Sequence, residues 1–280
     1  GFCRRRPAYI PPEMREDRGE IEAGLEGRLP AIVKYEEIKG DFHVHSKYSD
    51  GSASLEEIAE KARRLGLKWV AVCDHSQSLK VAGGMDLKAL EKKQAAIKAF
   101  NAKSRDVKFL CGAEVEIGVD GRLDYPDEVL ASLDVVVAAI HTGFRQSKEV
   151  QTRRLLSAVK NPYVHVIAHP TGRLLGEREA YALDLEAVIA AAAQTQTFLE
   201  INAYYKRLDL NDVHCRAAAE KGVRFAIGSD AHVLDQMEFL DLGVGVARRS
   251  WLTGPQVLNT LNHEELLGIL RRKRDFLSNK

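Results

Sequence analysis

Long hydrophobic runs are absent from this chain of 280 residues. No apolar stretch approaches the roughly 18 residues that would indicate a membrane span, and the N-terminal stretch GFCRRRPAYIPPEMRED lacks the hydrophobic core of a secretory signal. We therefore expect a cytoplasmic protein. The sequence also lacks a C-x-x-C pair, which predicts free thiols rather than a disulfide framework or a thiolate zinc site for Cys3, Cys73, Cys111 and Cys215.

Excess charge of one sign is absent as well. The formal net charge is +1 at pH 7, which argues against a protein that coats nucleic acid by bulk electrostatics but allows a local basic patch. The sequence lacks the Gly-rich phosphate-binding loop that would favour an open, doubly wound sheet. The chain has 45% hydrophobic and 29% charged residues, a composition typical of one large globular α/β domain with a full core.

The first 39 residues are rich in charged side chains, contain four prolines and lack a sustained hydrophobic periodicity. They predict an arm or linker over residues 1–39, with one short helix around Glu20 to Leu25. From Gly40 to residue 280, short apolar runs alternate with helical patterns such as SLEEIAEKARRLG, where Ser54 and Glu57 form a capping box. The seven predicted strands are GDFHVHS, KWVAVCDHS, VKFLCGAEVEI, LDVVVAAIHTG, YVHVIAHPTG, TFLEINA and VRFAIGSDAH. Seven such β/α units favour an α/β barrel that is closed or nearly closed.

Polar residues lie near the C-terminal end of every predicted strand. Active sites of β/α barrels form on that face, so we expect these residues to converge. His43 and His45 alone could be a hydrogen-bonded pair near a surface turn, but six of the nine histidines occupy such positions. The strand-end residues are His43, His45 and Asp50; Asp74 and His75; Glu114; His141; His169; Glu200 and Asn202; and Asp230 and His232.

Six imidazoles together with Asp50, Glu114 and Asp230 are too many ligands for one tetrahedral zinc ion. They suit two or three divalent ions that share a bridging carboxylate. Such a centre would keep a positive charge beside its three carboxylates and would attract a phosphate. Metal ions in this arrangement bind phosphoryl oxygens, activate water and stabilise the leaving oxygen, which predicts phosphoester hydrolysis.

The motifs DFHVHSKYSDG, CDHS, GAEVEI, AAIHTGF, IAHPTGRLLG and GSDAH resemble those of the polymerase and histidinol phosphatase (PHP) domain. The resemblance runs over residues 40 to 262. AYIPPEMREDRGEIEAG, ahead of these motifs, is similar to the C-terminal region of bacterial and archaeal family X DNA polymerases. This resemblance implies a distorted (β/α)7 TIM-like barrel with three Mn2+ or Zn2+ ions, and Fe2+ is compatible with the same ligands.

The resemblance also implies an activity and a set of ligands. The activity is a 3′→5′ exonuclease that processes blocked 3′ ends during DNA repair, including 3′-phosphates and abasic sites. DNA with 3′ ends is the expected partner, together with a polymerase region in the same or a separate chain. By position, one ion would be held by His43, His45, Glu114 and Asp230; a second by Asp50, His75 and His232; and a third by Glu114, His141 and His169.

Residues beyond the ligand set are predicted to contact substrate. Arg173 could clamp a phosphate as part of the catalytic group, or form a surface ion pair. Asn202, Tyr204, Lys206 and Arg207 suit stacking and charge contacts with single-stranded DNA, or an ordinary amphipathic loop. Two other functions stay open: a small-molecule phosphatase of the histidinol phosphatase type, and a non-catalytic metal-binding module of a polymerase.

Overall fold

The computed structural model describes residues 8–278, and its centre is a sheet of seven parallel strands in the order β1-β2-β3-β4-β5-β6-β7. Val44 forms a bridge with Ala231, and His45 N donates to Ala231 O at 2.8 Å, so the last strand returns to the first. The predicted barrel is therefore confirmed as nearly closed. The strands are β1 (Gly40–Val44), β2 (Trp69–Val72), β3 (Lys108–Glu116), β4 (Val135–Ala139), β5 (Val166–Ile167), β6 (Phe198–Asn202) and β7 (Phe225–Gly228).

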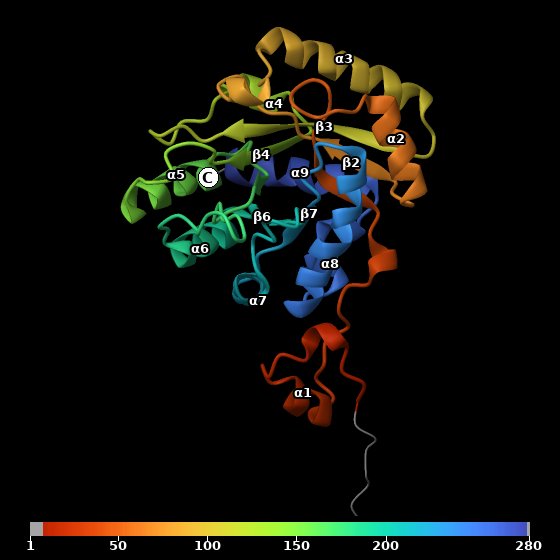
Figure 1. Ribbon diagram of the computed structural model, residues 1–280, viewed down its shortest axis with the longest axis vertical. Helices are drawn as coiled ribbons and strands as arrows, with labels where there is room; N and C mark the ends of the chain where they lie inside the picture. Colours follow the sequence, from red (N-terminus) through yellow and green to blue (C-terminus); the bar gives the residue numbers. More distant parts are fainter. Residues whose placement is uncertain (1–7, 279–280) are drawn as a thin grey trace, which may run out of the picture.

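Helices surround the strands (Figure 1). The predicted cap of α2 is present, because Ser54 accepts from Glu57 N and Glu57 accepts from Ser54 N. The α-helices are α1 (Glu20–Glu26), α2 (Leu55–Arg64), α3 (Leu87–Lys103), α4 (Asp127–Ala131), α5 (Lys148–Lys160), α6 (Leu185–Thr195), α7 (Asp212–Glu220), α8 (Leu240–Arg249) and α9 (His263–Ser278). The 3-10 helices are η1 (Pro12–Met14), η2 (Tyr35–Glu37), η3 (Lys80–Ala82), η4 (Leu234–Phe239), η5 (Gly254–Gln256) and η6 (Leu258–Thr260). Among the described residues, no helix has the length and apolar character needed to cross a membrane.

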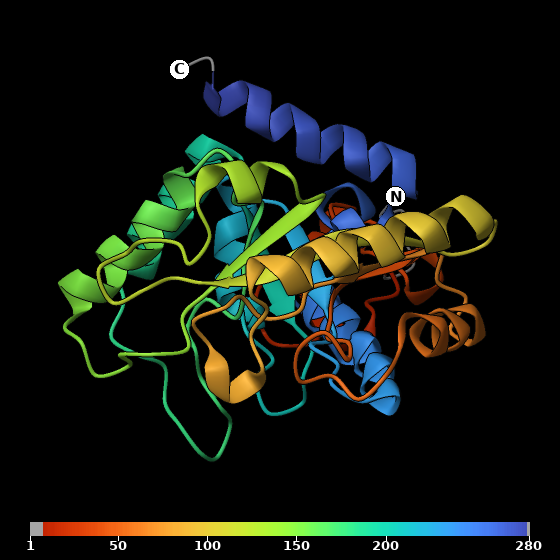
Figure 2. The same cartoon turned by 90° about the horizontal axis from the view of Figure 1, so that it is seen from above.

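The barrel interior is apolar near the N-terminal ends of the strands. Phe42, Trp69 and Phe198 form a buried cluster there with Leu266 and Leu270 of α9. In Figure 2, α9 (dark blue) lies on one side of the barrel, and the loops around residues 80 and 175 extend on the other side. Apolar side chains thus fill one end of the barrel, and the polar strand-end residues occupy the other.

The N-terminal segment from residue 8 onward packs against α8. Met14 is fully buried, and Arg248 Nε lies 2.6 Å from Glu13 Oε1. Arg18 also pairs with Asp212 at 2.5 Å. The predicted short helix is present as α1, which Figure 1 shows apart from the sheet. The boundary at residue 40 stays a prediction.

Three of the four cysteines lie within the described residues, and they are free thiols as predicted. Cys73, Cys111 and Cys215 are buried and unbonded to one another. Cys3 lies outside the described residues, as do all of residues 1–7.

Candidate metal centre

The nine predicted ligands come together at the C-terminal ends of the strands. Eight of them form three overlapping groups, and in each group the potential ligand atoms all lie within 4.8 Å of one another. The ninth, His169, belongs to none of these groups, but its Nε2 lies 2.9 Å from Glu114 Oε1. Because His45 and His75 each belong to two groups, the three groups are parts of one site. We name them the His43 group (His43, His45 and Asp230), the Asp50 group (His45, Asp50, His75 and His232) and the His141 group (His75, Glu114 and His141).

Glu114 of β3 lies at the centre of the site and is 1% exposed. Its Oε1 lies 2.9 Å from His169 Nε2 and 3.1 Å from His141 Nε2. Its Oε2 lies 3.0 Å from His75 Nδ1 and 3.5 Å from His43 Nε2. The Nε2 of His45 also lies 3.6 Å from Oε2. One carboxylate thus faces five imidazoles, an arrangement that suits the predicted bridging ligand.

Two site residues have a left-handed backbone. His169 follows β5 with φ +27°, and Asp230 follows β7 with φ +54°. Residues other than glycine seldom adopt such angles, and those that do cluster at functional sites. The Asp230 N–H donates to His43 O at 2.8 Å, which anchors this turn to β1. The strained turns thereby direct both side chains toward the shared centre.

Two further carboxylates contact the Nδ1 atoms of imidazoles whose Nε2 atoms face Glu114. Glu200 Oε1 lies 2.7 Å from His43 Nδ1, and Glu116 Oε2 lies 2.7 Å from His141 Nδ1. These contacts leave each Nε2 directed at Glu114 and set the ring orientation. Glu116 is not among the predicted site residues, although Glu114 and Glu116 share a strand face by the same i, i+2 spacing as His43 and His45.

Burial and neighbouring cations keep two imidazoles neutral. Burial lowers the pKa of His45 to about 4, with a further contribution from the nearby His232. Burial and the Arg207 guanidinium likewise lower the pKa of His169 to about 4. Neutral imidazoles have free lone pairs and are therefore ready to bind a cation.

Carboxylates have the opposite effect on a third imidazole. Burial alone would lower the pKa of His75, but Glu114 and Asp50 outweigh it and raise this pKa to about 10. Burial alone would raise the pKa of Glu114, but His141, His75 and His43 hold it well below its usual value. A cation that binds between these groups must replace the proton of His75.

Several buried polar atoms have no hydrogen-bond partner among the described residues. They include His45 Nδ1, His169 Nδ1 and Glu114 Oε2. His75 Nδ1 is also unsatisfied, since its 3.0 Å approach to Glu114 Oε2 is not aligned as a hydrogen bond. Unsatisfied buried imidazole and carboxylate atoms are costly unless a ligand pairs with them. This donor set fits divalent transition metals.

The predicted substrate residues lie in different places. Asn202 is fully buried, and its Nδ2 donates to Asp230 Oδ2 at 3.0 Å and to Glu200 Oε2 at 3.1 Å, so it lies behind the site. Arg173 Nε donates to Arg207 O at 2.9 Å, and a second N–H group of Arg173 donates to Leu208 O. Two N–H groups of the predicted phosphate clamp are thus engaged with the main chain.

Arg207 and Tyr204 line a pocket together with two of the predicted ligands. Arg207 Nε is 3.4 Å from Asp230 Oδ2, whereas Lys206 Nζ pairs with Glu177. A pocket of about 350 Å³ adjoins the site. It is lined by Leu174, Tyr204, Arg207, Asp230, His232 and Gln236. An aromatic ring and a guanidinium therefore lie beside the candidate metal centre.

The remaining histidines, His165, His214 and His263, belong to none of the three ligand groups. His165 is fully buried, and its Nδ1 accepts from Val136 N at 3.0 Å. His214 lies in α7, and His263 begins α9.

Residues 41–205 match the model of the PHP domain family, and the chain belongs to this family. It is 41% identical over 263 residues to the DNA polymerase/3′-5′ exonuclease PolX of Bacillus subtilis (strain 168). That match covers 94% of this chain and 46% of the relative, so the chain spans about half the length of this polymerase. The chain is also 32% identical to a protein named "Probable phosphatase" of Thermoanaerobacter sp. (strain X514), over 79% of this chain and 89% of the relative.

The solved structure of histidinol phosphate phosphatase from Lactococcus lactis, complexed with zinc, L-histidinol and phosphate, shares the fold. Its TM-score is 0.55 at 15% identity, over 76% of this chain and 94% of that one. The family, the fold and the donor set together define a PHP-domain protein with the site of a metal-dependent phosphoesterase.

Proposed function

We propose that this chain is a 3′→5′ exonuclease that processes 3′ ends of DNA in repair. In this proposal it removes terminal nucleotides and 3′-phosphates, and it cleaves at abasic sites. The observation that carries the proposal is the set of three ligand groups around Glu114, which adjoins the pocket that contains Tyr204 and Arg207. The identity with the B. subtilis polymerase/3′-5′ exonuclease over 94% of the chain supports DNA as the substrate.

The site would hold three divalent ions, Mn2+, Zn2+ or Fe2+, with Glu114 as the shared ligand. The proposed ligands are the nine residues predicted from the sequence, with His169 added to the His141 group because of its 2.9 Å approach to Glu114. Such ions supply positive charge for phosphoryl oxygens and activate water. Glu200 and Glu116 would hold the His43 and His141 rings in place.

Contacts to DNA would come from the side of the pocket. Arg207 would contact a phosphate beside Asp230, and Tyr204 would stack on a base. Arg173 would hold the turn at residues 207–208 and reach phosphate with N–H groups other than the two that the main chain occupies. Lys206 would contact the DNA backbone after releasing Glu177. Asn202 would act indirectly, through Asp230.

A polymerase region, in the same or a separate chain, is the proposed partner. The B. subtilis relative is about twice as long as the matched segment, so the chain corresponds to about half of a larger polymerase. That region would bring 3′ ends to this site.

A small-molecule phosphatase is the second candidate function. It is favoured by the 32% identity over 89% of the Thermoanaerobacter protein, which is named a phosphatase. The pocket of about 350 Å³ could hold a small phosphate ester as well as a terminal nucleotide.

The test is a gel assay with a 5′-labelled single-stranded primer, Mn2+ and three proteins: wild type, Asp230→Ala and the control Asp235→Ala. The side chain of Asp235 is 96% exposed, so this control removes a carboxylate outside the ligand groups. We expect a ladder of shortened primers with wild type and Asp235→Ala, and an intact primer with Asp230→Ala. An intact primer with wild type, together with phosphate release from histidinol phosphate, would favour the second candidate. If metal-loaded wild type hydrolyses neither compound, the result would favour the non-catalytic metal-binding module instead.

A further inference from the structure

A buried ion pair lies beside the candidate metal centre but includes none of its ligands. Lys93 of α3 and Asp74 after β2 are both fully buried, and Lys93 Nζ lies 2.7 Å from Asp74 Oδ2. The Lys93 ammonium also donates to Val72 O at 2.8 Å and to Gly112 O at 2.9 Å. Removing two charges from water has a desolvation cost that can exceed the attraction between them, so a buried ion pair need not stabilise the fold. A positioning role is a more specific explanation.

Asp74 joins Lys93 to the segment that carries the Asp50 ligand. Its Oδ1 accepts from Ser46 N at 2.7 Å and from Ser49 Oγ at 2.9 Å. Its Oδ2 accepts from Ser46 Oγ at 2.8 Å. In the chain, Ser46 follows His45, Ser49 precedes Asp50, and His75 follows Asp74. The ion pair is therefore next to three of the four ligands of the Asp50 group.

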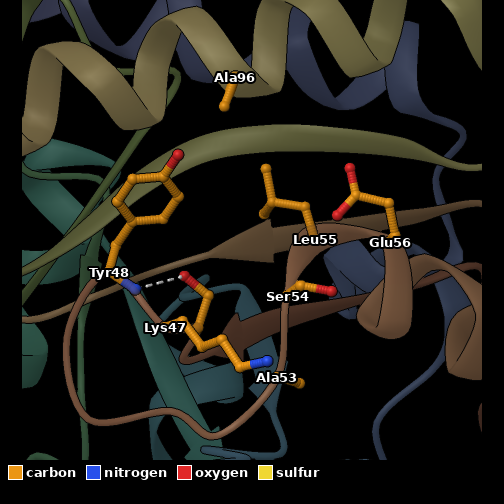
Figure 3. A pocket seen from close by; sticks show the side chains of 8 residues that line it. Lys47, Tyr48, Ala53, Ser54, Leu55, Glu56 and Ala96 are labelled. Carbon is orange, nitrogen blue, oxygen red and sulfur yellow. Dashed lines mark hydrogen bonds between the residues drawn. The ribbon is translucent and has the colours of Figure 1, made fainter.

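The same segment is separated from α3 by a pocket. A pocket of about 270 Å³ separates residues 46–56 from α3, and Ala96 is the residue of α3 that lines it. Figure 3 shows the Tyr48 ring in this space, with its hydroxyl directed toward α3. Main-chain hydrogen bonds from Lys47 N to Ala53 O and from Ser52 N to His232 O hold other parts of the segment. Because the pocket takes the place of side-chain contacts with α3, the hydrogen bonds to Asp74 connect the segment to Lys93 of that helix.

We propose that Lys93 is a positioning residue for the Asp50 group. It fixes the Asp74 carboxylate, and Asp74 holds residues 46–50 so that Asp50 faces His75 and His232 before a cation binds. In the structure, Asp50 Oδ2 lies 3.5 Å from His75 Nε2 and 3.3 Å from His232 Nε2. This inference rests on the metal centre of the proposed function, and it is independent of the substrate.

The test compares Lys93→Met with the control Lys92→Met, whose side chain is exposed on the same helix. The first readout is hydrogen exchange of residues 46–51 in metal-free protein. Lys93→Met should speed exchange there, since the Ser46 N–H then loses its fixed acceptor. The second readout is Mn2+ bound per chain at equilibrium. We expect one ion to bind about 10- to 100-fold more weakly in Lys93→Met, as for other outer partners of metal ligands, and unchanged binding in Lys92→Met.

Ser46→Ala keeps the inference testable should Lys93→Met fail to fold. This variant removes one hydrogen bond to Asp74 without leaving a buried charge unpaired, and it should change both readouts in the same direction by a smaller amount. Unchanged exchange and unchanged Mn2+ binding in the folded variants would overturn the inference. Absence of Mn2+ binding by the wild type would instead contradict the proposed function.

Discussion

Two carboxylates of β3 have different roles at this site: one faces the centre of the ligand groups, and the other orients a predicted ligand. Glu114 faces five imidazoles from the centre, whereas Glu116, two residues further along the same face of β3, contacts the other nitrogen of the His141 ring, Nδ1. Glu116 also accepts from His141 N at 3.0 Å and from Thr142 Oγ1 at 2.8 Å. Its carboxylate therefore sets both the ring and the main chain of one predicted ligand.

We expect Glu116→Gln to weaken metal binding by about 10- to 100-fold, because an amide cannot match the charge-assisted contact to His141 Nδ1. Titration of metal-free protein with Mn2+, followed by calorimetry, measures the change. The matched control is Glu128→Gln on α4, where the side chain is exposed. Equal affinity in the two variants would show that Glu116 does not orient His141.

At the scale of elements, β1 and β7 must approach closely for the site to form. Gly228 is the last residue of β7, and a Cβ built there would lie 2.5 Å from His43 Cβ and 2.6 Å from Glu200 Oε1. No side chain fits at this separation without movement of its neighbours. The glycine thus allows the contact that closes the barrel at the metal centre.

Gly228→Ala should lower the free energy of unfolding by about 1–3 kcal/mol, because it overpacks the interior. It should also displace the His43 ring and weaken Mn2+ binding. Urea unfolding and Mn2+ titration measure the two effects. Gly268→Ala in α9 is the control, since the nearest atom to its added Cβ is 3.9 Å away. Wild-type stability and wild-type metal binding in Gly228→Ala would contradict the packing argument.

At the scale of the whole molecule, the N-terminal segment packs against α7 and α8. Met14 is fully buried, and Glu13 and Arg18 make ion pairs with Arg248 and Asp212. This docking involves none of the predicted metal ligands. The segment should therefore respond to mutation separately from the site.

We expect Met14→Ala to release this segment, because truncation of a buried methionine costs about 2–5 kcal/mol. Limited trypsin digestion should then cut at Arg15 and Arg18 faster than in the wild type, while the Mn2+ content stays the same. Tyr9→Ala is the control, because Tyr9 is 75% exposed. A loss of Mn2+ in Met14→Ala would show that the segment supports the metal centre after all.

The sequence alone was sufficient for the strands and the barrel, whereas the role of the nine strand-end residues as metal ligands stays a prediction. This success has a local cause: an apolar run followed by a histidine or carboxylate identifies a strand and its C-terminal end without knowledge of the partners. Prediction was less accurate where the tertiary structure overrides the local pattern. The predicted strand YVHVIAHPTG contains only two residues of strand, Val166–Ile167, and the chain then turns at His169.

Contacts between residues distant in the sequence were decided by the tertiary structure. The sequence determined that His43 and His45 share one face of a strand, because side chains alternate along an extended chain. Only the fold decided that Glu200 supports His43, that Asp230 reaches β1, and that Lys93 is buried beside Asp74. These pairs depend on how the strands register and on how the barrel closes, and neither is encoded in the spacing of residues along the chain.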